Sequence, residues 1–277
     1  MGLRINTNVQ ALAAQRFLRT NGENQKTSIE HLASGSRINK AADDAAGLAI
    51  SEKLKGDIRS YRQATKNAND GVSLIQVAEG GLTEIGNILS RLRELSIQGA
   101  SDTVNQTERS FINKEVQQMK SEIDRITEST EFDGTHLLNG SSPFYEIQVG
   151  IHNGETVDRF RFESGSLVTS INELGLADVS TATKESAQNN LEAIDKAFDT
   201  INGNRAYLGA LQNRFVSTIA SLGVSRETAE SANSRIRDTD MAEESSDLVK
   251  NNILSQASLS VLAQANQTPQ MALKLLG

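Results

Sequence analysis

The chain has 277 residues, a net charge of −7 and no cysteine. The missing thiols exclude disulfide scaffolds, cysteine–zinc sites and thiol catalysis, and the acidic balance argues against a nucleic-acid-binding face. Aromatic residues make up only 4% and there are two prolines, which favours long, polar-faced helices over a compact globular core.

The N-terminal segment predicts a helix with a thin apolar face. Ile5, Val9 and Leu12 share that face, and Ile29 and Leu32 continue the apolar pattern. The opening residues turn polar too soon for the apolar core of a secretory signal, so any export would follow another route. No stretch of the chain approaches 18 apolar residues, and we therefore expect no membrane-spanning helix.

Three longer segments carry the heptad repeat of helices that pack side by side. They run from about residue 58 to 98, from about 106 to 130 and from about 183 to 222. Matching seams predict a bundle of long antiparallel helices. In the last segment, Arg205 and Gln212 fall among the seam positions, where they either loosen the packing or lie at an edge that faces water.

The hydrophobic period changes between residues 131 and 180. Residues 146–149 alternate polar and apolar, residues 157–162 are rich in β-formers, and Asn153-Gly154 provides a turn signal between them. These features predict a β-hairpin over about residues 144–162 with Asn-Gly at its turn. Short strands and loops are expected over the remainder.

The last segment, from about residue 241 to 276, is predicted to be helical, with Pro269 expected to kink or fray it. Its apolar residues fall on several faces: Leu254, Ala257, Val261 and Ala265 on one, and Leu259, Leu262 and Leu273 on others. Both terminal helices bury too little to offset an ordering cost of about 1–2 kcal/mol per residue. We therefore expect both ends to be disordered in the monomer and to fold against each other and neighbouring copies.

No arrangement of residues points to catalysis, a metal or a cofactor. The three histidines are far apart in the sequence and match no metal-binding spacing: His31, His136 and His152. The acidic pairs Asp43-Asp44 and Asp238/Asp240 are interpreted as solvated acids and helix caps. A structural, self-associating protein is predicted, and not an enzyme.

Residues 34–50, Ser-Gly-Ser-Arg-Ile-Asn-Lys-Ala-Ala-Asp-Asp-Ala-Ala-Gly-Leu-Ala-Ile, closely resemble the N-terminal signature of bacterial flagellins. The opening Ile5-Asn6-Thr7-Asn8 and the closing segment 260–270 resemble the ends of that family, and Arg91-Leu92-Arg93-Glu94-Leu95 is a further match. The resemblance covers most of the chain.

The resemblance implies a mainly α fold, in which a long antiparallel bundle carries a small β-hairpin region and the terminal helices pair as an inner coiled coil. Residues 1–42 and 236–277 would form the two halves of that inner domain. Residues 43–180 would supply a linker and the first part of an outer rod domain, and residues 181–235 its last helix. The stretch 131–180 is too short for the variable outer domains of larger flagellins.

The implied function is that of a subunit of the extracellular flagellar filament, with many identical copies; a copolymer with a second flagellin type is an alternative. Expected partners are the flagellar export apparatus, an export chaperone on the C-terminal helix, the filament cap and hook-junction proteins. The residues expected to drive polymerisation are Ile5, Val9, Leu12, Ile29, Leu32, Leu254, Ala257, Val261, Leu262 and Leu273.

The resemblance also implies a surface read by a Toll-like innate immune receptor, with Arg91, Leu95 and Glu115 as central contacts. Ser90 departs from the Gln common in strongly recognised members. Two alternatives stay open, namely a hook–filament junction protein and a cytoplasmic coiled-coil signalling protein. The second lacks a reason for the hairpin and for the matches at both termini.

Overall fold

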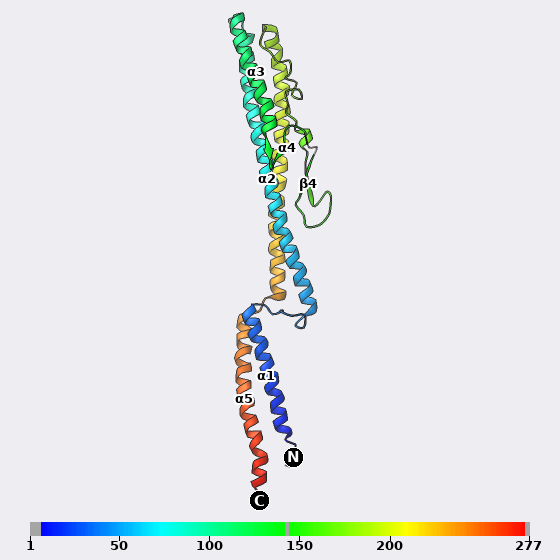
Figure 1. The fold of residues 1–277 in the computed structure, drawn as a ribbon, viewed down its shortest axis with the longest axis vertical. Coiled ribbons are helices and arrows are strands. Elements are labelled where there is room, and N and C mark those ends of the chain that lie inside the picture. Colours follow the sequence, from blue (N-terminus) through cyan, green and yellow to red (C-terminus); the bar gives the residue numbers. More distant parts are fainter. Residues whose placement is uncertain (1–6, 142–143, 275–277) are drawn as a thin grey trace. The chain divides into compact units, whose positions relative to one another are not determined.

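The computed structural model describes residues 7–141 and 144–274, with side chains up to residue 267. The described chain is mainly helical, as predicted. In chain order its elements are α1 (Val9–Ser34), α2 (Ala45–Ala100), α3 (Gln106–Ser129), β1 (Glu131–Phe132), β2 (Thr135–His136), β3 (Tyr145–Gln148), β4 (Arg159–Phe162), the 3₁₀ turn η1 (Ser164–Ser166), α4 (Lys184–Arg237) and α5 (Met241–Lys274) (Figure 1).

The chain divides into two compact units. The terminal unit comprises residues 1–58 and 228–277, and the middle unit comprises residues 59–227. Both divisions fall inside long helices, the first in α2 and the second in α4. The boundaries expected near residues 43 and 236 lie at helix ends, close to the start of α2 and the end of α4.

The middle unit is a helical bundle around a core of large aliphatic side chains. In this unit α3 and α4 run antiparallel to α2 (Figure 1). The three helices bury the predicted seams in one hydrophobic cluster, whose fully buried members include Leu82, Ile85, Leu89, Leu92, Val116, Ile123, Ile194, Leu208 and Phe215. The antiparallel bundle predicted from the heptads is confirmed. Arg205 lies at the edge of the seam, exposed to solvent and 3.8 Å from Glu79.

The predicted start of α2 near residue 58 and the predicted end of α4 near residue 222 are wrong, whereas the predicted start of α3 is confirmed. α2 begins at Ala45, where the Asp44 carboxylate accepts from the Gly47 N–H at 2.9 Å, and α4 continues to Arg237. The extra turns of α4 carry only two large apolar residues, Val224 and Ile236, and so no heptad signal. α3 begins as predicted, because Asn105 and Glu108 form a reciprocal capping box. α5 runs through Pro269 to Lys274, so the proline does not end it.

The predicted hairpin is confirmed, but not its turn. β3 and β4 pair antiparallel, with Gln148 opposite Arg159. The ten-residue connection has no left-handed turn at Gly154, whose N–H donates instead to the Asp158 carboxylate at 2.9 Å. The tight two-residue turn lies between β1 and β2, where Asp133 and Gly134 both have positive φ.

The terminal unit pairs α1 with α5, antiparallel to each other (Figure 1). Gly35 ends α1 in the left-handed conformation, with its N–H bonded to the His31 carbonyl at 2.8 Å. The chain segments that follow α1 and precede α5 are joined by backbone bonds, from Arg37 N–H to the Arg237 carbonyl and from Thr239 N–H to the Gly35 carbonyl. Of the helices that the structure describes, none is long and apolar enough to cross a membrane.

Candidate assembly surface

The seam between α1 and α5 consists mostly of small and polar side chains. The positions that are buried or half-buried alternate in steps of three and four, as in a coiled coil. On α1 they are Ala11, Ala14, Leu18, Asn21, Gln25, Ser28 and Leu32, and on α5 they are Glu244, Leu248, Asn251, Ser255, Ser258, Leu262 and Ala265. The predicted pairing of the terminal helices is confirmed, although the sequence had not assigned the residues of its seam.

Polar contacts across this seam fix its register. The Asn21 side chain donates to the Ser258 hydroxyl at 3.3 Å, and the Gln25 side chain donates to the side-chain oxygen Oδ1 of Asn252 at 2.7 Å. At the start of α1, Asn8 donates to the Ala265 main-chain carbonyl at 2.7 Å. A shift by one turn would break all of these bonds, so they specify alignment while adding little hydrophobic stabilisation.

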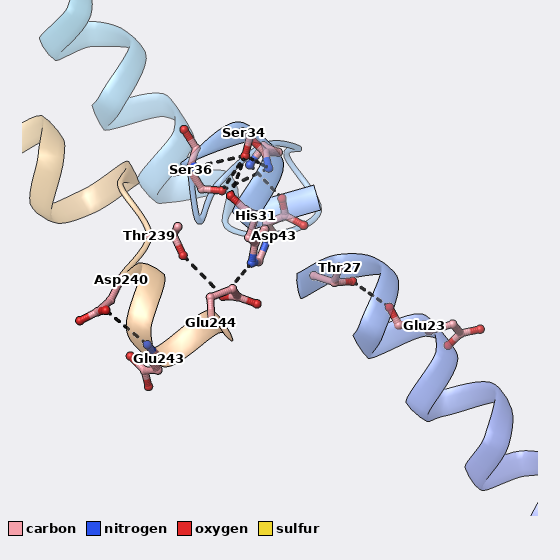
Figure 2. Close-up of polar contacts among 11 residues, drawn as sticks. Glu23, Thr27, His31, Ser34, Ser36, Asp43, Thr239, Asp240, Glu243 and Glu244 are labelled. Carbon is pink, nitrogen blue, oxygen red and sulfur yellow. Dashed lines mark hydrogen bonds and ion pairs between the residues drawn. The ribbon is translucent and has the colours of Figure 1, made fainter. Parts of the chain in front are cut away.

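The other end of the seam carries a histidine–carboxylate contact, shown in Figure 2. His31 Nδ1 lies 3.3 Å from Glu244 Oε2, and their side chains are only 14% and 18% exposed. The Thr239 hydroxyl donates to the same carboxylate oxygen at 3.5 Å. His31 is therefore part of the helix pairing, a role that its sequence spacing did not suggest.

Asp44 and Asp240 cap helices, as predicted, and Asp43 anchors the loop before α2. The Asp43 carboxylate accepts from the backbone N–H groups of Lys40 at 2.9 Å and Asn39 at 3.0 Å. These bonds favour the ionised form and lower the pKa of Asp43. Asp240 accepts from the Ala242 N–H at 2.8 Å and so caps α5.

Most of the residues predicted to drive polymerisation point away from the seam. Large apolar side chains are exposed along both helices: Val9, Leu12, Phe17 and Ile29 on α1, and Ile253, Leu254, Leu259 and Val261 on α5. Ala257 is also exposed, whereas Leu32 and Leu262 are half-buried. Ile5 and the side chain of Leu273 lie outside the described residues. The apolar face that the sequence revealed is thus a solvent-facing surface of the single chain.

A shallow groove opens on this surface. Its rim is formed by Phe17 and Val261, which are 58% and 56% exposed, and the buried Ala14 and Ala265 line it where the two helices meet. Small residues at the seam let the backbones approach closely, and the large side chains beside them create the hollow. The groove has room for an aliphatic side chain.

The proposed receptor surface lies in the middle unit. Arg91 donates from Nε and Nη2 to Glu115 Oε1, at 3.1 and 2.9 Å, and from Nη1 to Glu94 at 2.8 Å. These side chains are 40–67% exposed. Leu95, however, is 1% exposed inside the core. It supports this surface from beneath, and only Arg91 and Glu115 of the expected set are available for contact.

The burial of one lysine was not predicted from the sequence. Lys120 lies on the buried face of α3 and is only 8% exposed. Its ammonium donates to the carbonyls of Ala177 at 2.6 Å and Val179 at 3.2 Å, which ties a long loop to the helix. Burial lowers the pKa of Lys120. Its spacing from Val116 and Ile123 was a signal that could have placed it on the seam.

Comparison with known proteins decides the family. The model for the bacterial flagellin N-terminal helical region matches residues 5–143, and that for the C-terminal helical region matches residues 191–276. The chain belongs to the bacterial flagellin family. It is 42% identical to flagellin of Halalkalibacterium halodurans and 42% identical to the flagellar filament 30.7 kDa core protein of Treponema maltophilum, covering 98% of this chain and 99% of each relative.

The solved structures agree with this assignment. The crystal structure of Bacillus cereus flagellin superposes with a TM-score of 0.50 at 27% identity, covering 57% of this chain and 88% of that one. Flagellins are structural proteins that form the extracellular filament of the bacterial flagellum. The expected structural role and location of this flagellin are thereby confirmed, and the family is not an enzyme family.

Proposed function

We propose that this flagellin polymerises through the outward-facing apolar side chains of α1 and α5, while the middle unit folds independently of assembly. The observation that carries the proposal is where the terminal unit places its large apolar side chains. Most side chains in the helix–helix seam are small or polar, whereas Leu12, Phe17, Leu254 and Val261 are exposed. Exposed apolar area stabilises only when it is covered, at about 25 cal/mol per Å². Neighbouring copies would cover it.

Seeded polymerisation tests this proposal. Purified chain should elongate filament seeds, and removal of residues 1–34 or 241–277 should abolish elongation while leaving the thermal unfolding of the middle unit unchanged. Phe17→Ala and Val261→Ala should each slow elongation, because they empty the rim of the groove. A control is Val157→Ala, which removes an even more exposed valine from a loop of the middle unit. Trimmed protein that still elongates would refute the proposal.

The remaining partners are those that membership of the flagellin family implies. Before assembly an exposed apolar helix invites premature association, so a cytoplasmic chaperone would cover α5 and the chain would pass unfolded through the flagellar export apparatus. The filament cap would receive it at the tip, and hook-junction proteins would contact the first subunits. A chaperone that protects α5 from proteolysis in the unpolymerised chain would support this sequence of events; equal digestion with and without chaperone would not.

We also propose that Arg91 and Glu115 contact a host Toll-like receptor in the monomer. The supporting geometry is an exposed guanidinium that is hydrogen-bonded to two carboxylates, one turn of α2 before the buried Leu95. Arginine held in this way is well suited to a binding hot spot. Arg91→Ala should lower receptor signalling by at least about tenfold. Arg125→Ala on α3, which removes an arginine exposed and paired with Glu122, serves as the control.

A further inference from the structure

Two stripes of the terminal unit carry complementary side chains in matching order. On α1, Leu12, Arg19 and Lys26 recur every seven residues, and all three are exposed. On α5 and its cap, the exposed series is Asp240, Asp247 and Leu254, again seven residues apart. Residues spaced by seven lie on one line along a helix in a coiled coil. Each stripe is therefore a continuous outer edge of its helix.

The two stripes fit each other only when antiparallel and in one register. Placing Asp247 opposite Arg19 also places Leu254 opposite Leu12 and Asp240 opposite Lys26. Sliding by one heptad in one direction sets Leu254 against Arg19, and in the other direction it sets Asp247 against Leu12. Both shifts place a charge against a leucine, so the complementary register is specified by charge as well as by apolar contact.

The stripes cannot meet within one chain. The contacts of Gln25 with Asn252 and of His31 with Glu244 place Asp247 level with about residue 28 of α1. Arg19 is therefore about ten residues further along the pair, which is about 15 Å at 1.5 Å per residue. Among the described side chains of its own chain, Asp247 forms an ion pair with Lys250, 3.5 Å away on the same exposed face of α5. A second copy that is displaced along the axis supplies the partner.

We propose that α5 of one copy packs antiparallel on α1 of a neighbouring copy, with Asp247 opposite Arg19 and Leu254 opposite Leu12, at an axial displacement of about 15 Å. The inference rests on the proposed polymerisation through these helices and names the pairing that it uses. Both copies point in the same direction, and the contact joins different faces of the two chains. Such a contact does not close on itself and propagates an open assembly.

Charge swapping tests the pairing. Arg19→Glu and Asp247→Lys should each lower the rate of seeded elongation by about three- to tenfold at low salt, because one exposed attraction becomes a repulsion. The double variant should recover most of the wild-type rate. An equimolar mixture of the two single variants should also elongate, because alternating copies restore both kinds of contact. Lys53→Glu changes the net charge as much as Arg19→Glu does and is the control.

Cross-linking supplies a second readout. Because the chain has no cysteine, Leu12→Cys chains mixed with Leu254→Cys chains should form disulfide dimers in filaments, whereas Leu12→Cys mixed with Ile253→Cys should not. A double charge variant that elongates no faster than the slower single variant, or filaments without the dimer, would overturn the pairing. Failure of the wild-type chain to elongate at all would instead overturn the proposed polymerisation.

Discussion

The two units of this flagellin bury different kinds of side chain. The middle unit buries Leu, Ile and Phe completely, whereas the seam of the terminal unit consists of Ala, Ser, Asn, Gln and Glu with a few half-buried Leu. Folding of a single chain needs enough apolar burial to offset the entropy of ordering. The middle unit has that burial within one chain, whereas the terminal helices leave their largest apolar residues exposed. The difference shows how one chain can separate folding from assembly.

The largest contrast is expected between two phenylalanines. Phe215 is fully buried and stacks edge-to-face on Phe160 with ring centres 4.9 Å apart, whereas Phe17 is 58% exposed. Phe215→Ala should lower the free energy of unfolding of the monomer by about 3–5 kcal/mol. Phe17→Ala should change it by less than about 0.5 kcal/mol. Urea unfolding of the two variants checks this, and a comparable loss for both would remove the contrast.

The polar seam offers a second comparison. Gln25→Leu alone leaves Asn252 without its hydrogen-bond partner and should weaken the terminal pair by about 1 kcal/mol. Replacing both Gln25 and Asn252 with Leu should recover or exceed the original stability, because two apolar groups then meet. Amide exchange of α1 in assembled filaments measures the effect. If the double variant is no more protected than the single one, the bond is not what aligns the helices.

Glycine substitutions sharpen the contrast between turn and helix. Gly134 has a φ of +74°, so Gly134→Ala should destabilise the β1–β2 turn by about 1 kcal/mol. Gly203 lies within α4 with open space around it, so Gly203→Ala should stabilise by about 0.5–1 kcal/mol. Thermal unfolding compares the two variants. A shift in the same direction for both would contradict the assigned backbone conformations.

The smallest expected effect is a pH dependence at Asp43. Its pKa in the folded chain lies below the ordinary value of 3.8, so its contribution to stability is present above about pH 3.8. That contribution is lost as the pH falls through the lowered folded pKa. Exchange protection of the Lys40 and Asn39 amides should therefore fall in acid, and Asp43→Asn should remove that dependence. An unchanged acid profile in the variant would exclude Asp43 as its source.

The sequence predicted the middle unit better than the terminal one. Leu and Ile at heptad positions between residues 74 and 95 predict a buried seam directly, and the alternation of polar and apolar residues at 146–149 predicts a strand. The α1–α5 seam carries a weaker signal, because Asn21, Gln25 and Ser28 stand between its leucines. The stronger apolar pattern at Val9 and Leu12 marks the exposed face and not this seam.

Local polar contacts also escaped prediction. Asn153-Gly154 looks like a tight turn, but the Asp158 carboxylate accepts from nearby backbone N–H groups and holds a longer loop open. Lys120 resembles a surface residue until the carbonyls of Ala177 and Val179 provide its partners. In each case the deciding contact is made by a residue outside the motif, and spacing alone does not reveal it.

Amide hydrogen exchange on the monomer and on filaments tests the division between folding and assembly most directly. The account predicts that α1 and α5 exchange almost freely in the monomer and become protected in filaments, whereas the middle unit is protected in both states. Strong protection of α1 and α5 in the monomer would contradict it, because the terminal pair would then be stable without its neighbours.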